Sequence, residues 1–145
     1  MAASAGLRRK RTKHETSPPL SERIEKELVA LADSTYEDDE RFIAPETVEF
    51  ARRLVCAFVE HGFREPDSLG YYQTSCATAA SFGWWKAKVD TMVAFDLAEP
   101  SVTLLIPAES VSCKWTSDDL GTPISHNAVA KLVSKALRVA GIGKL

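Results

Sequence analysis

The stretch FGWWKAKVDTMVAFDLAEPSVTLLIPAESVSCKW, residues 82–115, decides the fold of this chain. Side chains alternate in character from Thr91 to Leu97, and residues 102–106 are apolar and rich in β-branched types, as is typical of strands. Residues 98–101 carry turn chemistry, and a further short strand is expected from Ser110 to Trp115. Strands this close together leave no room for crossover helices, so the stretch predicts an antiparallel meander of three to four strands.

Two helical patterns precede this stretch. Ser21 suits the N-cap of a first helix, because its hydroxyl can accept a bond from a free backbone N–H. Pro45 suits the first position of a second helix, where a missing N–H costs nothing. Gly62 can take the left-handed conformation that ends this helix, and Phe63 can then fold back on Phe58.

A last helix follows the strands, with Thr122 as its expected cap, Pro123 at its first position and Gly141 as its stop. Segregated helices and strands predict an α+β fold, in which the meander packs against two to three helices. Residues 64–78 are expected to form a long loop. We expect residues 1–19 to be a disordered basic arm and residues 20–145 to be a single α+β domain.

The charge is unevenly distributed along the chain. The net charge of −2 combines +5 over residues 1–14, −7 over residues 15–40 and zero over the remainder. The asymmetry therefore lies outside the expected core, where it affects partners more than the fold. The N-terminus carries no apolar signal segment, and no run is long enough to span a membrane. We expect a soluble, cytoplasmic protein that does not associate with membranes.

The residues that usually carry chemistry form no recognisable constellation. The three cysteines, Cys56, Cys76 and Cys113, form no CxxC pair, and reduced thiols in a reducing compartment are the simplest interpretation. The histidines have no metal-ligand spacing, and nucleotide-binding and hydrolase motifs are absent from the sequence. We therefore expect no enzyme activity, no cofactor and no bound metal. An enzymatic alternative would place its site around the 64–78 loop, with Tyr71, Tyr72, Ser75 and Cys76 near His61.

The aromatic residues suggest a protein-binding surface. Trp84 and Trp85 are adjacent, so on a strand their rings point to opposite faces of the sheet. One indole can join the core, and the other then faces outward unless something covers it. Together with Trp115 on a neighbouring strand, these residues are candidates for contact with a partner protein or a second copy. The plainer interpretation is a sheet covered on both faces, or an indole that lies under the 64–78 loop.

Two basic elements suggest nucleic-acid binding as an alternative. The arm and the exposed face of the last helix could together grip a phosphate backbone, with an affinity that falls as salt rises. The candidate residues are Arg8, Arg9, Lys10, Arg11, Lys13, Lys131, Lys135 and Arg138. In a nucleated cell, the run at residues 8–11 would also pass as a nuclear-import cluster. The plainer interpretation is a solubilising tail and a solvated helix face.

These observations rank three classes of function. The first is a small non-catalytic accessory or interaction module that presents a sheet face or edge to a protein partner. This class requires at least one exposed tryptophan. The second is a nucleic-acid-binding protein, and the third is an enzyme built from scattered residues.

Overall fold

The computed structural model describes residues 19–33, 43–70, 77–143 and 145 of the chain. Two helices, α1 (Glu22–Asp33) and α2 (Pro45–Glu60), come first. Five strands follow: β1 (Ser68–Gly70), β2 (Ala79–Trp84), β3 (Thr91–Asp96), β4 (Ser101–Ile106) and β5 (Val111–Thr116). A 3-10 turn (Pro107–Glu109) joins β4 to β5, and the short α3 (Ser117–Leu120) and the long α4 (His126–Val139) complete the order.

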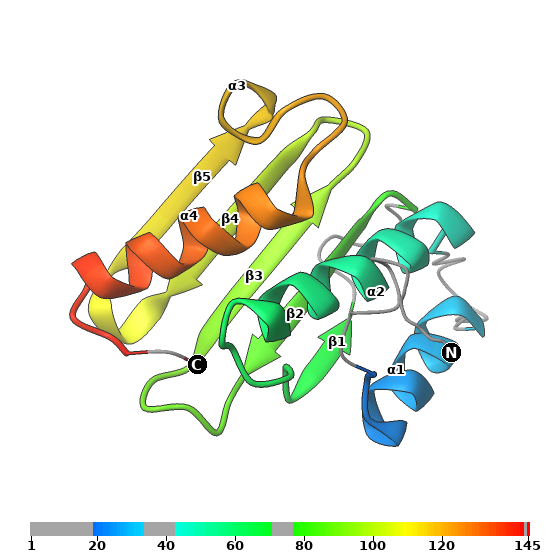
Figure 1. The fold of residues 1–145 in the computed structure, drawn as a ribbon, viewed down its shortest axis with the longest axis horizontal. Coiled ribbons are helices and arrows are strands. Elements are labelled where there is room, and N and C mark those ends of the chain that lie inside the picture. The colour runs from blue at the N-terminus through cyan, green and yellow to red at the C-terminus, as the bar shows by residue number, and fades with distance from the viewer. Residues whose placement is uncertain (1–18, 34–42, 71–76, 144) are drawn as a thin grey trace, which may run out of the picture.

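The strands form one antiparallel sheet in the order β1-β2-β3-β4-β5 (Figure 1). The predicted antiparallel meander is therefore confirmed, with five strands where three to four were expected. The additional strand, β1, lies within the 64–78 segment that was expected to be a loop. Its three residues carry no alternating pattern, and only their pairing with residues 81–83 of β2 makes them a strand.

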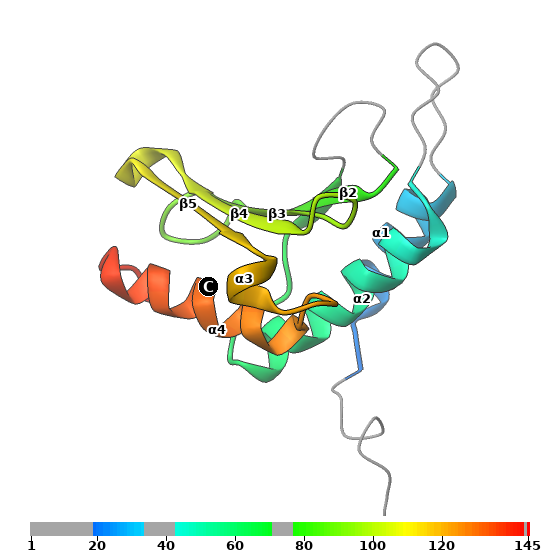
Figure 2. The same ribbon diagram turned by 90° about the horizontal axis from the view of Figure 1, so that it is seen from above.

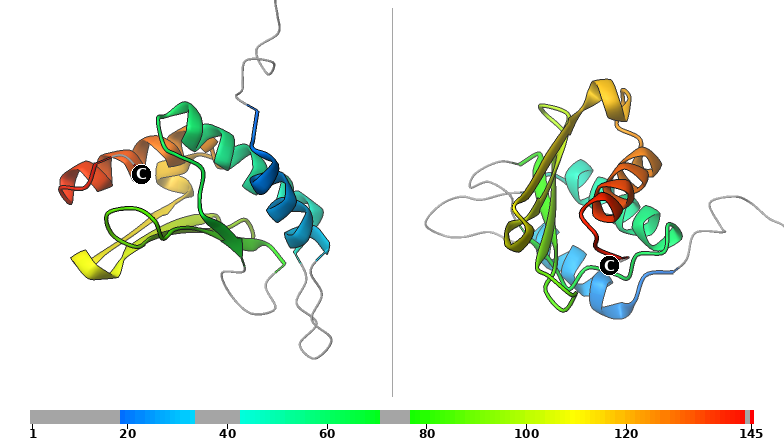
Figure 3. Two further views of the ribbon diagram at one scale, coloured as in Figure 1. Left: turned by 90° about the horizontal axis from the view of Figure 1, so that it is seen from below. Right: turned by 90° about the vertical axis from the view of Figure 1, so that its left-hand side faces the viewer.

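All the helices lie on one side of the sheet, giving the two-layer α+β arrangement that the sequence predicts (Figures 2 and 3). Alternate strand residues face this layer: Phe82 of β2, Val93 of β3 and Leu104 of β4 are paired in register and fully buried. The apolar faces of α1, α2 and α4 complete the core from the other side. No helix of the described residues is long and apolar enough to cross a membrane.

Local signals place the ends of the first two helices as predicted. The Ser21 hydroxyl accepts a bond from Ile24 N–H at the start of α1. Gly62 is left-handed, with φ of 91°, and the N–H of Phe63 donates to Phe58 O. The rings of Phe58 and Phe63 stack with their centroids 5.0 Å apart, so the predicted fold-back at the end of α2 is confirmed.

The predicted start of the last helix is wrong. Residues 121–124 form a turn, and α4 begins at His126 with Ser125 as its N-cap. The Ser125 hydroxyl accepts a bond from Ala128 N–H at 3.2 Å, and its own N–H donates to Leu120 O. Ile124 is buried in the core. That tertiary contact favours a turn over the helix that Thr122 and Pro123 would otherwise start.

Candidate functional site

The three tryptophans occupy three different environments. Trp84 is fully buried, and its Nε1–H donates to Arg64 O at 2.9 Å, so it presents no surface to a partner. Trp85 lies on the opposite face and is 49% exposed. Trp115 is half-buried on β5, on the same side of the sheet as Trp84. Trp85 and Trp115 therefore do not form one continuous aromatic surface.

The sheet face opposite the helices carries mostly small and polar side chains. The Trp85 indole lies over Gly83, and its Nε1–H donates to the Ser68 hydroxyl at 2.8 Å. The register places the following residues on this face: Ala79, Ser81, Gly83, Met92, Ala94, Asp96, Ser101, Thr103, Leu105, Ser112, Lys114 and Thr116. The apolar side chains that this face offers to a partner are Trp85 and the partly exposed Met92 and Leu105, which lie in register beside Gly83.

The two edges of the sheet differ in a way that bears on function. At the β1 edge, helix α1 supplies partners for the backbone. Leu69 N–H donates to the Glu27 carboxylate at 2.9 Å, and the Arg23 guanidinium donates to the carbonyls of Pro66 and Asp67. These bonds close the edge against a further strand.

The β5 edge has no such cover among the described residues. Strand β5 pairs with β4 alone, and no helix side chain of the described parts bonds to the backbone of residues 111–115. At the end of the strand, the N–H of Thr116 donates to the carboxylate of Asp119 at 3.4 Å. Backbone groups on the free side of an edge strand are available for pairing with another chain.

An apolar groove of about 540 Å³ lies between this open edge and α4. Strand β5 supplies one wall, mainly through its alternate residues Val111, Cys113 and Trp115 with Ser112 beside them, and α4 supplies the other. The residues from α4 and its C-terminal end are Leu132, Lys135, Ala136, Val139 and Ala140. Val139 is 81% exposed, more than any other large apolar residue described. The groove therefore joins exposed apolar surface to unpaired strand backbone.

The sequence contained a signal for this groove. The core stripe of α4 is Val129, Val133 and Leu137, which are all buried. Leu132, Ala136 and Val139 form a second apolar stripe at helical spacing beside it. This second stripe makes the apolar face of the helix wider than core packing requires, which is a sequence signal for an exposed apolar surface.

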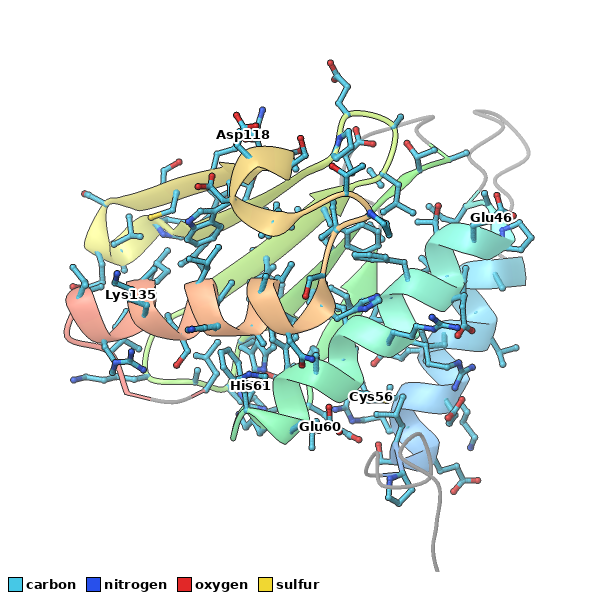
Figure 4. The ribbon with its side chains drawn as sticks, turned by 45° about the horizontal axis from the view of Figure 1, so that its top comes forward. Glu46, Cys56, Glu60, His61, Asp118 and Lys135 are labelled. Atoms are coloured by element: carbon cyan, nitrogen blue, oxygen red, sulfur yellow. The ribbon has the colours of Figure 1, made fainter. Side chains whose placement is uncertain are left out.

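The charge around the groove is positive. Lys114 on β5 and Lys131, Lys135 and Arg138 on α4 are all exposed, and neither element contains an acidic residue. The nearest acids in sequence are Glu109 before β5, and Asp118 and Asp119 after it. Figure 4 shows Lys135 on α4 beside β5, and Asp118 on α3 beyond the end of the strand. Of these cations Lys135 lines the groove, Lys114 lies on the opposite face of the sheet, and Arg138 lines a separate small hollow with Phe63.

A second hollow of about 510 Å³ lies between α2 and the start of α4. His126 lines it, with its ring centroid 4.5 Å from that of Phe50. Burial lowers the pKa of His126, and the nearby Arg53 lowers it further. The hollow is lined by Pro45, Glu46, Glu49, Phe50, Arg53, Pro123, Ile124 and His126. This lining contains no serine, threonine or cysteine, so it offers the histidine no hydroxyl or thiol to activate.

Of the five residues named for the enzymatic alternative, the structure describes only His61. Tyr71, Tyr72, Ser75 and Cys76 lie outside the described residues. His61 Nδ1 lies 2.9 Å from Ala57 O, which is a helix-end contact. Cys56 is a free thiol whose pKa is raised by burial, which disfavours the reactive thiolate. No group of three metal-ligating side chains occurs among the described residues.

The nucleic-acid candidates are placed only in part. Lys131, Lys135 and Arg138 lie on exposed positions of α4, as the helical spacing predicts. The five basic residues of the arm, Arg8, Arg9, Lys10, Arg11 and Lys13, lie outside the described residues.

Comparisons of the chain with models of known families, with curated proteins and with solved structures found no match. Its function is therefore inferred from its own geometry.

Proposed function

We propose that this chain is a non-catalytic interaction module that binds a partner protein at the β5 edge and the β5–α4 groove. The difference between the two sheet edges carries this proposal. Side chains of α1 bond to the backbone of the β1 edge, whereas the β5 edge is left open beside an apolar groove.

The energetics of the groove favour occupation by a partner. Covering Val139 and the apolar walls of the groove would remove apolar surface from water at roughly 25 cal/mol per Å². A partner strand would also pair with the backbone groups of β5 that have no strand partner among the described residues. Exposed apolar surface bordered by charge is a common feature of protein-binding sites.

Two exposed valines provide a matched test. Val139→Glu places a charge in the groove, and Val29→Glu makes the same change on α1, beside the closed edge, where Val29 is 56% exposed. Each variant is used to capture partners from extracts of the native cells. The captured proteins are identified by mass spectrometry and purified, and their dissociation constants are then measured.

We expect Val139→Glu to weaken binding of the purified partner by at least about tenfold, because a carboxylate would be buried in an apolar contact. Val29→Glu should leave the affinity unchanged. A partner that binds both variants as tightly as the wild type would show that the groove is not the binding site. Equal weakening by the two variants would also contradict the proposal.

A further inference from the structure

Building on the proposed function, we infer that the partner enters the groove as an extended acidic segment that pairs with β5 as a sixth strand. Its alternate apolar side chains would lie between β5 and α4. Its acidic side chains would lie on the opposite face of the sheet, beside Lys114 of β5.

The alternation of β5 favours a strand as the occupant. The register turns Val111, Cys113 and Trp115 to one face of the sheet and Ser112 and Lys114 to the other, although Ser112 also borders the groove. A strand added beside β5 continues this alternation, so every second side chain would enter the groove. A helix lying in the groove would cover the same apolar walls, but it would leave the backbone of β5 unpaired.

The charge selects the composition of this strand. Lys135 lines the groove, Lys114 is exposed in the middle of β5 on the opposite face of the sheet, and neither β5 nor α4 contains an acid. Aspartate or glutamate on the outward face of the added strand would be attracted to Lys114, and lysine or arginine there would be repelled. A strand in which apolar and acidic residues alternate fits both the walls and the charge.

The same charge disfavours a second copy as the occupant. In a two-fold antiparallel pairing of β5 with itself, paired residues must share a sheet face. In the registers that pair most of β5, Lys114 would lie directly opposite its own copy or diagonal to it, and like charges in these positions destabilise a pair. A lysine in the middle of an edge strand is a known device against self-pairing.

Synthetic peptides can test this inference on the full chain. The main probe is a peptide of about ten residues that alternates valine and glutamate, long enough to span β5. One control peptide alternates valine and lysine. A second has the composition of the probe, with all valines preceding all glutamates, so that it keeps the charge and loses the alternation. A generic DNA duplex tests for a nucleic-acid partner instead.

Binding is followed by NMR chemical shifts and by hydrogen exchange of the β5 amides. We expect the alternating acidic peptide to bind at least about tenfold more tightly than either control peptide, and to slow exchange of β5 amides. Lys114→Glu, on the face where the charged side chains of the peptide would lie, should reverse the preference between the acidic and basic peptides. Lys26→Glu on the exposed face of α1 is the matched control and should not change it.

Several results would overturn the inference. One is equal affinity for the alternating and block peptides, and another is binding without protection of β5 amides. A third is tighter binding of the DNA duplex, which would favour a nucleic-acid partner. If Val139→Glu abolishes binding of the natural partner but β5 stays unprotected in that complex, the inferred strand is wrong and the proposed function stands. If Val139→Glu leaves that binding intact, the proposed function fails as well.

Discussion

Adding a single methyl group at Gly83 should test how the Trp85 indole is held on the sheet. Gly83 is a β2 residue whose φ lies outside the left-handed region, so alanine fits its backbone. The space above it is occupied, however. A Cβ at this position would lie 2.0 Å from Cζ2 and 2.4 Å from Cε2 of Trp85, so the indole must move.

The cost follows from the surface that the indole covers. Trp85 is 49% exposed, so about half of its surface is buried against the sheet. A fully buried tryptophan covers up to about 250 Å². Losing half of this, at about 25 cal/mol per Å², costs at most about 3 kcal/mol. Because the displaced ring keeps part of its contact, we expect Gly83→Ala to destabilise the protein by about 1–2 kcal/mol.

The sign should reverse when the indole is absent. In a Trp85→Ala background the indole no longer occupies the space above Gly83, and alanine is favoured over glycine within a strand by roughly 0.5–1 kcal/mol. The four proteins of this cycle are unfolded in urea and followed by circular dichroism. A coupling free energy of about 2 kcal/mol is expected. If Gly83→Ala has the same effect in both backgrounds, the indole does not determine the residue at this position.

Three further predictions concern the β1 edge, a histidine and the core. Glu27→Ala should lower the free energy of unfolding by about 1–2 kcal/mol, because the Leu69 amide loses its charged acceptor. Hydrogen exchange of that amide should become faster, and Glu27→Gln should have a smaller effect on both. Because the pKa of His126 is lowered in the folded protein, this histidine is protonated at a higher pH in the unfolded chain than in the folded one. Stability measured in urea should therefore decline as pH falls below about 6.5, with less decline in His126→Phe; equal decline would exclude this histidine as the cause. Phe58→Ala should cost about 3–5 kcal/mol in thermal unfolding, because its ring meets three other aromatic rings in the core. A loss below about 1 kcal/mol would show that those contacts do not stabilise the core.

Short-range chemistry explains most of the fold predictions that are confirmed. The cap at Ser21, the left-handed Gly62 and the alternation through β3 each depend on residues a few positions apart. Their physical cause is contained in the local sequence, so they can be read from it. The start of α4 shows where this fails. Thr122 and Ser125 are both good caps, and the burial of Ile124 favours the second.

Pairing and exposure required the tertiary structure. Strand β1 is a strand only because β2 lies beside it, and Trp84 and Trp85 divide between core and surface only because helices cover one face. The β5 edge is likewise open because no described segment lies beside it, and no local sequence pattern predicts this. Backbone conformation responds to interactions within a few residues, whereas burial and edge protection depend on segments far apart in the chain. The candidate site belongs to the second kind, since its two walls come from β5 and α4.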